Sequence, residues 1–311
     1  MRKTLIVIVA LAVVLYGGLI AYVKVNERAL VFQAERARGP LVPPAAEWKL
    51  PVTRVEFASG DGTSLVGWQI PGAMPDSNGT WVLVNHGNAH NISQLEEPEF
   101  LRDLRQLGTN ILIYDYRGFG ESGGEPDEEG AYADARAAYE LLRAKYGVPA
   151  ERIIIYGHSL GTGVAVQLAS TVSAGGLVLQ APYTSVPDLG ARRYPFLPVR
   201  QIAKYRFPSL ERMPKVTEPL LVLHSPQDKL VPLSMGEQLF SAAGSKDRRF
   251  VHVEGGHEVA FRVDSAIFFR AFREMVNRVA ARADSLERRL AGDAGRPARV
   301  APEPTGGRRR G

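Results

Sequence analysis

The chain has 311 residues, of which 45% are hydrophobic and 23% charged, an ordinary composition for a globular protein of one large or two small domains. Its net charge is +5, but the tail over residues 284–311 holds seven arginines against four acidic residues. Most of the excess charge therefore lies outside the globular part, which argues against a basic face that binds nucleic acid. The chain has no cysteine, so disulfides, thiol catalysis and cysteine metal sites are excluded.

The amino-terminal stretch predicts a membrane anchor. Residues 4–23 contain no charged residue and follow Arg2 and Lys3. As a helix this stretch spans about 30 Å, the thickness of the hydrocarbon core of a bilayer. A cleaved signal peptide is the alternative, but its cleavage needs small residues at the end of the apolar run, and that end reads Gly-Leu-Ile-Ala-Tyr-Val. We therefore expect an uncleaved transmembrane helix over residues 1–23.

The charges on the two sides of this anchor give opposing indications of its orientation. Arg2 and Lys3 favour a cytoplasmic N-terminus, whereas four basic residues between positions 24 and 38, partly offset by two glutamates, oppose it. On balance, we expect the soluble part of the protein to lie outside the cytoplasm.

The rest of the chain predicts a single α/β domain. Residues 24–50 form a polar, proline-containing connector, and residues 291–311 are rich in Gly, Pro and Arg and predict a disordered basic tail. Between them, over residues 51–290, strands alternate with helices, which indicates a mostly parallel sheet with helices on both faces. We expect eight strands at 53–58, 64–70, 81–85, 110–114, 152–156, 176–180, 219–224 and 249–253, and helices at 93–107, 128–146, 160–171, 233–242 and 259–289.

One motif in this pattern carries chemistry. The apolar run Ile153-Ile-Ile-Tyr leads into Gly157-His-Ser159-Leu-Gly161, and a helical pattern follows directly. A Gly-x-Ser-x-Gly turn between a strand and a helix exposes the serine hydroxyl at the end of the sheet, as a nucleophile requires. Glycines two residues before and after the serine avoid a collision of a Cβ atom with the neighbouring strand and helix. Ser159 is therefore the candidate nucleophile.

An acid and a histidine follow the serine in the order that this architecture requires. His257 is the late histidine, in the loop Glu254-Gly-Gly-His257 after the last strand, whereas His252 falls inside the strand pattern and is expected to point toward a helix layer. Asp228 follows strand 219–224 and is expected to accept the imidazole N–H and to fix its tautomer. Asp115 also follows a strand but precedes Ser159, and it is expected to brace the loop after it.

The loop after strand 81–85 is expected to help bind the oxyanion. The main-chain N–H of Leu160 follows the nucleophile, and that of Asn88 lies in His86-Gly-Asn-Ala-His90, so we assign the oxyanion hole to Asn88 and Leu160. His86 and His90 are four residues apart, but Gly87 directly after the strand argues against a metal-binding helix, and no H-E-x-x-H pattern is present. We therefore expect no metal at this pair of histidines.

These motifs together resemble those of the α/β-hydrolases, over about residues 50–280. The ordered set is the strand followed by His86-Gly-Asn88, then Asp115-Tyr-Arg-Gly-Phe-Gly-Glu-Ser122, Gly157-His-Ser-Leu-Gly161, Ser225-Pro-Gln-Asp228 and Gly256-His257. The resemblance is closest to the Bem46/ABHD13-like branch, whose members often carry an N-terminal membrane anchor. It implies an α/β-hydrolase fold and hydrolysis of esters, thioesters or amides without a cofactor. The chain departs from the branch's pattern at His90 and Ser225, where glycine is usual.

Between strands 176–180 and 219–224, a proline-rich segment predicts a small cap over Ser159, at about residues 182–214. Five aromatic residues in it either line an acyl pocket or pack the cap onto the domain: Tyr183, Tyr194, Phe196, Tyr205 and Phe207. We expect a membrane-anchored serine hydrolase of the esterase, lipase or thioesterase kind, acting on a small-molecule or lipid-like acyl ester. A non-catalytic binding protein on the same scaffold, and an acyltransferase or peptidase with the same triad, remain alternatives. The sequence does not indicate an oligomeric state.

Overall fold

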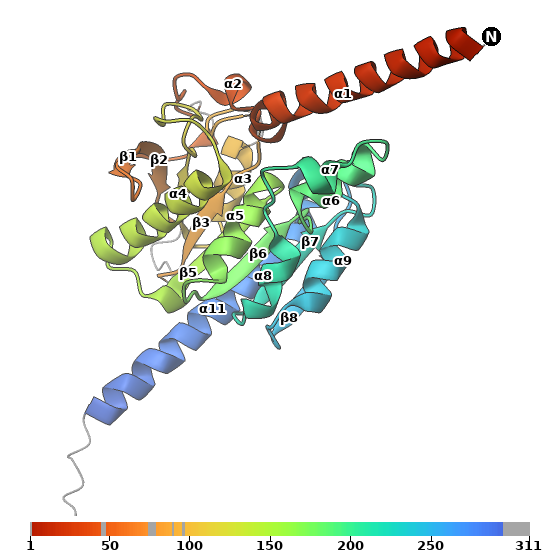
Figure 1. Ribbon diagram of the computed structural model, residues 1–311. Coiled ribbons are helices and arrows are strands. Elements are labelled where there is room, and N and C mark those ends of the chain that lie inside the picture. Colours follow the sequence, from red (N-terminus) through yellow and green to blue (C-terminus); the bar gives the residue numbers. More distant parts are fainter. Residues whose placement is uncertain (1, 45–47, 74–78, 89, 95–96, 295–311) are drawn as a thin grey trace, which may run out of the picture.

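A computed structural model describes residues 2–44, 48–73, 79–88, 90–94 and 97–294 (Figure 1). Its centre is an eight-stranded sheet in the order β1-β2-β4-β3-β5-β6-β7-β8. β2 pairs antiparallel with β1 and with β4, and the other neighbouring strands are all parallel. The predicted mostly parallel sheet is confirmed, with each strand within two residues of its expected bounds. The strands are β1 Thr53–Ala58, β2 Ser64–Ile70, β3 Trp81–Asn85, β4 Asn110–Tyr114, β5 Ile153–His158, β6 Gly176–Gln180, β7 Leu220–His224 and β8 Arg248–His252.

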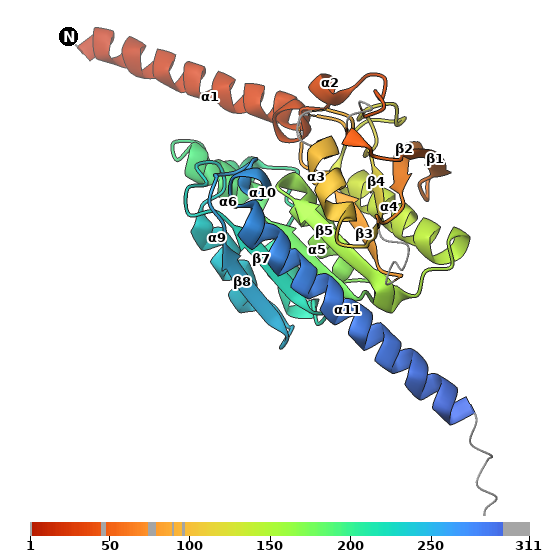
Figure 2. The same ribbon diagram turned by 180° about the vertical axis from the view of Figure 1, so that it is seen from behind.

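Helices cover both faces of the sheet, so the central strands are mostly apolar and carry polar residues mainly at their carboxyl ends. Every residue of β5, β6 and β7 is buried, as expected for parallel strands that lie between two helical layers. α4, α5, α8 and α9 lie on one face (Figure 1), and α3 and α11 lie on the other (Figure 2). The helices are α3 Glu97–Arg105, α4 Glu128–Glu140, α5 Leu160–Ala169, α6 Val186–Arg193, α7 Val199–Ile202, α8 Ser209–Arg212, α9 Leu233–Ala242, α10 Ala260–Val263 and α11 Ser265–Ala294.

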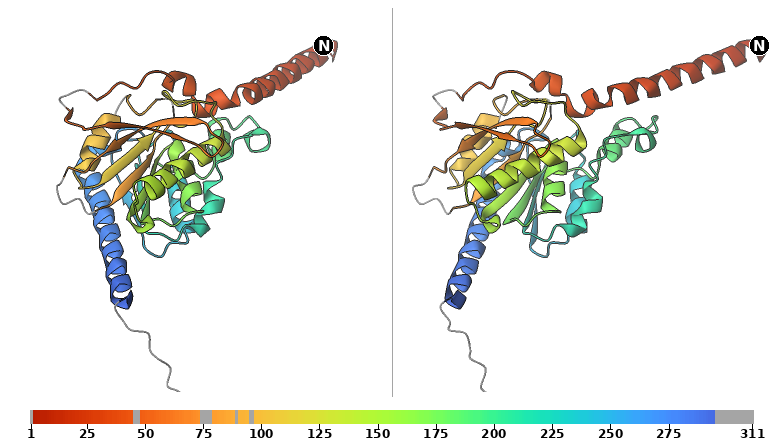
Figure 3. Two further views of the ribbon diagram at one scale, coloured as in Figure 1. Left: turned by 90° about the vertical axis from the view of Figure 1, so that its left-hand side faces the viewer. Right: turned by 60° about the vertical axis from the view of Figure 1, so that its left-hand side comes forward.

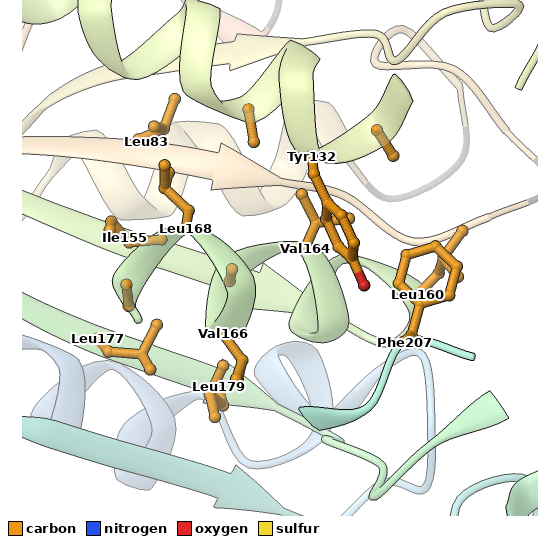
Figure 4. Close-up of a cluster of buried hydrophobic side chains, with 14 of the residues drawn as sticks. Leu83, Tyr132, Ile155, Leu160, Val164, Val166, Leu168, Leu177, Leu179 and Phe207 are labelled. Carbon is orange, nitrogen blue, oxygen red and sulfur yellow. The ribbon is translucent and has the colours of Figure 1, made fainter. Parts of the chain in front are cut away.

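The core on the α5 side fixes the position of the helix that follows the Gly-x-Ser-x-Gly turn. Val164 and Leu168 of α5 pack in one buried cluster with Leu83 of β3, Ile155 of β5 and Leu179 of β6 (Figure 4). Each of these side chains is at most 3% exposed. Because this contact spans three strands, α5 holds its amino terminus, and with it Ser159, at the carboxyl end of the sheet.

The amino-terminal helix differs from the prediction at its inner end. α1 runs from Arg2 to Phe32, and α2 (Ala34–Ala37) follows it, so the first part of the expected connector is helical. The sequence prediction failed here because the charged residues after position 23 suggested a solvated linker, whereas the domain buries Phe32. Within the described residues, α1 and α2 contain the one stretch long and apolar enough to cross a membrane. α1 projects away from the domain (Figures 1 and 3).

Three other predictions are corrected at the ends of elements. The helix expected to run to residue 146 ends as α-helix at Glu140 and continues as a π-helical turn, Leu141–Lys145. The last helix is interrupted after Val263 and then continues to Ala294, into the region expected to be disordered; residues 295–311 of that tail lie outside the described residues. His252 is exposed rather than directed toward a helix layer, because β8 is an edge strand with one half-buried and one buried residue.

Candidate active site

Ser159 occupies a strained turn between β5 and α5. Its backbone has φ 50° and ψ −120°, a conformation that is rare for a residue with a side chain and that is found at nucleophile turns. The flanking glycines are required by close backbone contacts. A Cβ atom on Gly157 would lie 2.5 Å from the carbonyl oxygen of Gly161, and one on Gly161 would lie 2.1 Å from that of Asn85. The turn therefore excludes side chains at both positions and directs the serine out of the sheet.

The three residues proposed from the sequence as a triad lie in hydrogen-bond contact. His257 Nε2 lies 2.8 Å from Ser159 Oγ, and His257 Nδ1 lies 2.7 Å from Asp228 Oδ2. Gly255 and Gly256, which precede the histidine, have φ of 109° and 77°, values that glycine adopts readily. These conformations turn the loop after β8 back over the sheet, where it meets residues from the ends of β5 and β7.

The environment of Asp228 keeps its carboxylate ionised and oriented. Oδ1 accepts the main-chain N–H groups of Leu230 and Val231, both at 2.8 Å, which leaves Oδ2 for His257. Burial by itself raises the pKa of Asp228, but contacts with His224 and His257 outweigh burial and hold the pKa well below its usual range. A charged acceptor at Nδ1 selects the tautomer in which Nε2 is free to accept a proton from the serine.

The loops that were assigned to the oxyanion hole flank the serine. Leu160 is the first residue of α5, where main-chain N–H groups are not used inside the helix. Gly87, next to Asn88, lies so close to the serine that a Cβ atom on it would be 3.6 Å from Ser159 Cβ. The side-chain amide of Asn88 donates to the carbonyl oxygen of Val31, 2.8 Å away. The last turn of α1 therefore holds the loop that carries the Asn88 N–H.

Three further contacts of this site were not foreseen from the sequence. His224, the last residue of β7, is buried, with Nε2 3.0 Å from the carbonyl oxygen of Val231 and 3.6 Å from Asp228 Oδ2. Glu258 Oε1 lies 3.8 Å from His257 Nε2. The third is the contact of Val31 with Asn88. The contact of Val31 with Asn88 has no local signal, because it depends on how distant segments meet. Glu258 adjoins His257, and His224 directly precedes Ser225-Pro-Gln-Asp228 in the strand pattern, but neither position by itself indicates the contact.

The residues around His86 form a buried support behind the loop assigned to the oxyanion hole. The His86 ring stacks on Tyr116 at a centroid distance of 4.5 Å, and its Nε2 lies 3.5 Å from Asp115 Oδ1. Asp115 Oδ1 also accepts the N–H of Ile92, and its carboxylate packs against Gly120, where a Cβ atom would lie 2.0 Å from Oδ2. Asp115 thus braces the loop that follows it, as expected. The rings of His86 and His90, the pair considered from the sequence as metal ligands, have centroids 6.3 Å apart.

The aromatic residues of segment 182–214 divide into two groups. Tyr183, Tyr205 and Phe207 are buried and pack on the domain; the Tyr183 hydroxyl donates to the carbonyl oxygen of Leu160, and Phe207 belongs to the same core cluster as α5. Tyr194 and Phe196 are 47% and 60% exposed. Tyr183, Tyr205 and Phe207 therefore pack the segment onto the domain, which is one of the two roles considered for these rings. Tyr194 and Phe196 do not have this packing role.

The fold and the site define the chain as an α/β hydrolase. Its sequence matches the alpha/beta hydrolase family over residues 81–304, and the chain belongs to that family, which confirms the resemblance to the α/β-hydrolases. An uncharacterized protein of Mycobacterium tuberculosis, MT2364, is 37% identical over 275 residues, which cover 88% of this chain and 95% of that protein. Human alpha/beta hydrolase domain-containing protein 17B is 35% identical over 161 residues, 51% of this chain and 54% of that protein.

Solved structures share the fold at lower identity. The Pyrococcus furiosus esterase Pf2001 aligns with a TM-score of 0.64 at 21% identity, over 78% of this chain and 98% of that one. An alpha-beta hydrolase from Vibrio vulnificus aligns with a TM-score of 0.60 at 22% identity, over 73% of this chain and 81% of that one. At these identities the similarity establishes the architecture, and the chemistry has to be argued from the site.

Proposed function

We propose that the protein is a membrane-anchored serine hydrolase that cleaves carboxylic esters or thioesters through an acyl-enzyme on Ser159. The observation that carries this proposal is the continuous chain of contacts from Ser159 Oγ to His257 and from His257 to Asp228, at 2.8 and 2.7 Å. The esterase named among the structural neighbours agrees with this class of substrate. In this proposal residues 51–290 form the catalytic domain and residues 182–214 a small cap.

The geometry supports a two-step reaction. His257 Nε2 accepts the Ser159 proton as Oγ attacks the acyl carbon, and the N–H groups of Asn88 and Leu160 stabilise the oxyanion that forms. The imidazolium, held by Asp228, then gives its proton to the leaving alcohol or thiol, and the acyl-enzyme remains. In the second step His257 accepts a proton from water, the hydroxide attacks the acyl carbon, and the proton returns to Ser159 as the carboxylic acid leaves.

Membrane attachment rests on the properties of α1. Its apolar side chains are exposed from Leu5 to Leu19, and Phe32 is its one buried side chain. A helix that is apolar on all sides and makes few contacts with its own domain is stable in a lipid environment. In this proposal Arg2 and Lys3 lie on the cytoplasmic side, and the catalytic domain lies on the other side.

Steady-state kinetics of the full-length Ser159→Ala variant test the catalytic proposal. We expect kcat on a short-chain ester to fall by up to about a million-fold, as in a related triad, with no loss of folded protein. Ser170→Ala, at the other end of α5, is the matched control and should leave kcat unchanged, because its hydroxyl donates to the carbonyl oxygen of Gln167 in its own helix. Equal activity of Ser159→Ala and the wild type would refute the proposal.

A further inference from the structure

The tip of segment 182–214 exposes apolar rings beside the membrane-spanning helix. We define the cap tip as Tyr194, Pro195 and Phe196, which connect α6 to α7. The rings of Tyr194 and Phe196 pack against each other with centroids 6.3 Å apart, and both are largely exposed. The hydroxyl of Tyr16, on α1, donates to the carbonyl oxygen of Phe196 at 2.7 Å. Two views show α1 extending past α6 and α7 on this side of the domain (Figures 1 and 3).

The position of Tyr16 on α1 determines how deep the cap tip would lie in a bilayer. Tyr16 lies within the uncharged stretch of α1, eight residues before Lys24, the first charged residue after it. At a rise of about 1.5 Å per residue, this places Tyr16 roughly 12 Å along the helix from Lys24. If Lys24 lies at the bilayer surface, a loop that touches Tyr16 reaches into the acyl-chain region, to a depth set by the tilt of the helix.

Three of the five backbone polar groups of the cap tip have a hydrogen-bond partner, which lowers the cost of such an environment. Unpaired N–H and C=O groups are costly in lipid. Here the N–H of Tyr194 donates to Gly190 at 2.8 Å, the N–H of Leu197 donates to Tyr194 at 3.0 Å, and the Phe196 carbonyl accepts from Tyr16. Pro195 has no N–H group. In a solvated loop, water would satisfy the Phe196 carbonyl group, and a hydrogen bond from a tyrosine of α1 would not be needed.

Basic residues flank the cap tip and the inner end of α1. They can reach anionic lipid headgroups while the rings lie deeper, the arrangement found in segments that bind at membrane surfaces. Asp188 pairs with one of them, Arg200, and Glu27 accepts the main-chain N–H groups of Lys204 and Tyr205. The exposed or partly exposed basic residues are Lys24, Arg28, Arg192, Arg193, Arg200 and Lys204.

The cap tip and the nucleophile belong to the same edge of the sheet. Segment 182–214 begins directly after β6, whose last residue, Gln180, accepts the N–H of Ser159 at 3.1 Å. Two exposed apolar residues, Leu230 and Val263, come from the loop that carries Asp228 and from α10, which follows His257. The triad, the cap tip and these two exposed side chains therefore all belong to segments that follow the carboxyl ends of the strands.

We propose that the cap tip inserts into the same bilayer as α1 and that Ser159 takes its substrate from the bilayer, as a long-chain acyl ester or thioester. The inference rests on the proposed hydrolase function and names its substrate class. The bilayer is the occupant of the apolar surface because α1, which lies against that surface, is itself of membrane-spanning length.

Because the chain has no cysteine, a single introduced cysteine can report depth in the full-length protein. Phe196→Cys, labelled with an environment-sensitive fluorophore, is reconstituted in vesicles of phosphatidylcholine and phosphatidylglycerol that carry nitroxide lipids. The matched control is Leu290→Cys, which is also exposed but lies near the far end of α11. We expect acyl-chain nitroxides to quench the label at position 196 and not the label at position 290. Equal, weak quenching at both positions would overturn the insertion.

The activity test uses the double variant Tyr194→Ser/Phe196→Ser. We expect its kcat/KM on 4-methylumbelliferyl palmitate held in vesicles to fall at least about tenfold, because membrane binding scales with buried apolar area. Its kcat/KM on the soluble acetate ester should not change, and Leu290→Ser should affect neither. An unchanged rate on the palmitate ester, or an equal loss on both esters, would overturn the inference. A wild type that cleaves neither ester contradicts the proposed hydrolase, while the quenching experiment still decides the insertion.

Discussion

The two longest helices of the protein, α1 and α11, are nearly equal in length, at 31 and 30 residues, but they differ in how they bury apolar side chains. α1 is apolar on all sides over residues 4–23, and of its residues only Phe32 is buried. α11 is apolar on one side and packs Phe268, Phe272 and Val276 against the sheet. Each helix therefore meets a different apolar environment: the protein's own core for α11 and, in our proposal, a lipid bilayer for α1.

The ends of the two helices reverse this contrast. The last turn of α1 joins the domain, where Phe32 packs edge to face against Tyr205 at 5.2 Å and Val31 holds Asn88. The last turns of α11 leave the domain (Figure 2) and are attached to it through ion pairs of Arg152 with Asp284 and Glu287. α1, which is exposed over most of its length, thus contacts the candidate active site at its inner end. The end of α11, the helix that packs in the core, is attached through ion pairs instead.

The largest expected effect is on stability, from the core side of α11. Phe272→Ala removes a fully buried ring that packs near Tyr156 and Phe268, and we expect it to lower the free energy of unfolding by about 3–5 kcal/mol. Leu15→Ala, on the exposed part of α1, should leave it unchanged. Denaturant unfolding of both variants in detergent measures the difference. Similar losses would show that α1 packs on the domain as α11 does.

A charge in the middle of α1 should act on membrane insertion instead. Val13→Arg is expected to make insertion less favourable by about 2.5–3.5 kcal/mol, the cost of arginine at the centre of a membrane-spanning helix. Extraction of membranes with alkaline carbonate should release more of this variant than of the wild type, and Leu290→Arg on α11 should behave like the wild type. If Val13→Arg and Leu290→Arg were retained equally, α1 would not be the anchor.

The contact between α1 and the loop that we propose binds the oxyanion should be visible in the kinetics. Asn88→Ala keeps the main-chain N–H but removes the hydrogen bond to Val31, so we expect kcat to fall about tenfold, or ~1.4 kcal/mol in activation free energy. KM on a soluble ester and the unfolding midpoint should change little. A rise in KM at constant kcat would mean that the side chain binds substrate and does not position the loop.

The smallest effect is expected at the outer end of α11. Arg152→Ala breaks the pairs with Asp284 and Glu287, whose carboxylates are about half exposed, and ion pairs of this kind contribute at most about 1 kcal/mol. Thermal unfolding should therefore shift only slightly, with catalytic activity unchanged. A loss as large as that of Phe272→Ala would show that the end of α11 is part of the core.

The difference between local and distant contacts also explains what the sequence could predict. Ser159 was predicted because the apolar strand, the glycines and the helix that position it are adjacent in sequence. The inner end of α1 was interpreted as a connector because Glu27 and Arg28 look like linker residues. Their partners, the main-chain N–H groups near Tyr205 and the Tyr205 hydroxyl, lie about 177 residues away. No local pattern encodes contacts over that separation.

The support of Asp228 by His224 joins residues only four apart, yet its geometry was not predictable from the sequence either. The strand position of His224 was predictable from the apolar run before it, but its contact with the carboxylate depends on the turn that brings Val231 back toward β7. The direction of a side chain at the end of a strand, and the group it meets, are properties of the assembled edge of the sheet.

The most direct test of the central claim is mass spectrometry of the full-length protein after reaction with a fluorophosphonate, which labels activated serines. The account predicts a single adduct on Ser159, absent from the His257→Ala variant, because the serine is activated through its contact with His257 Nε2. A folded wild-type protein that forms no adduct, or that is labelled on another serine, would contradict it.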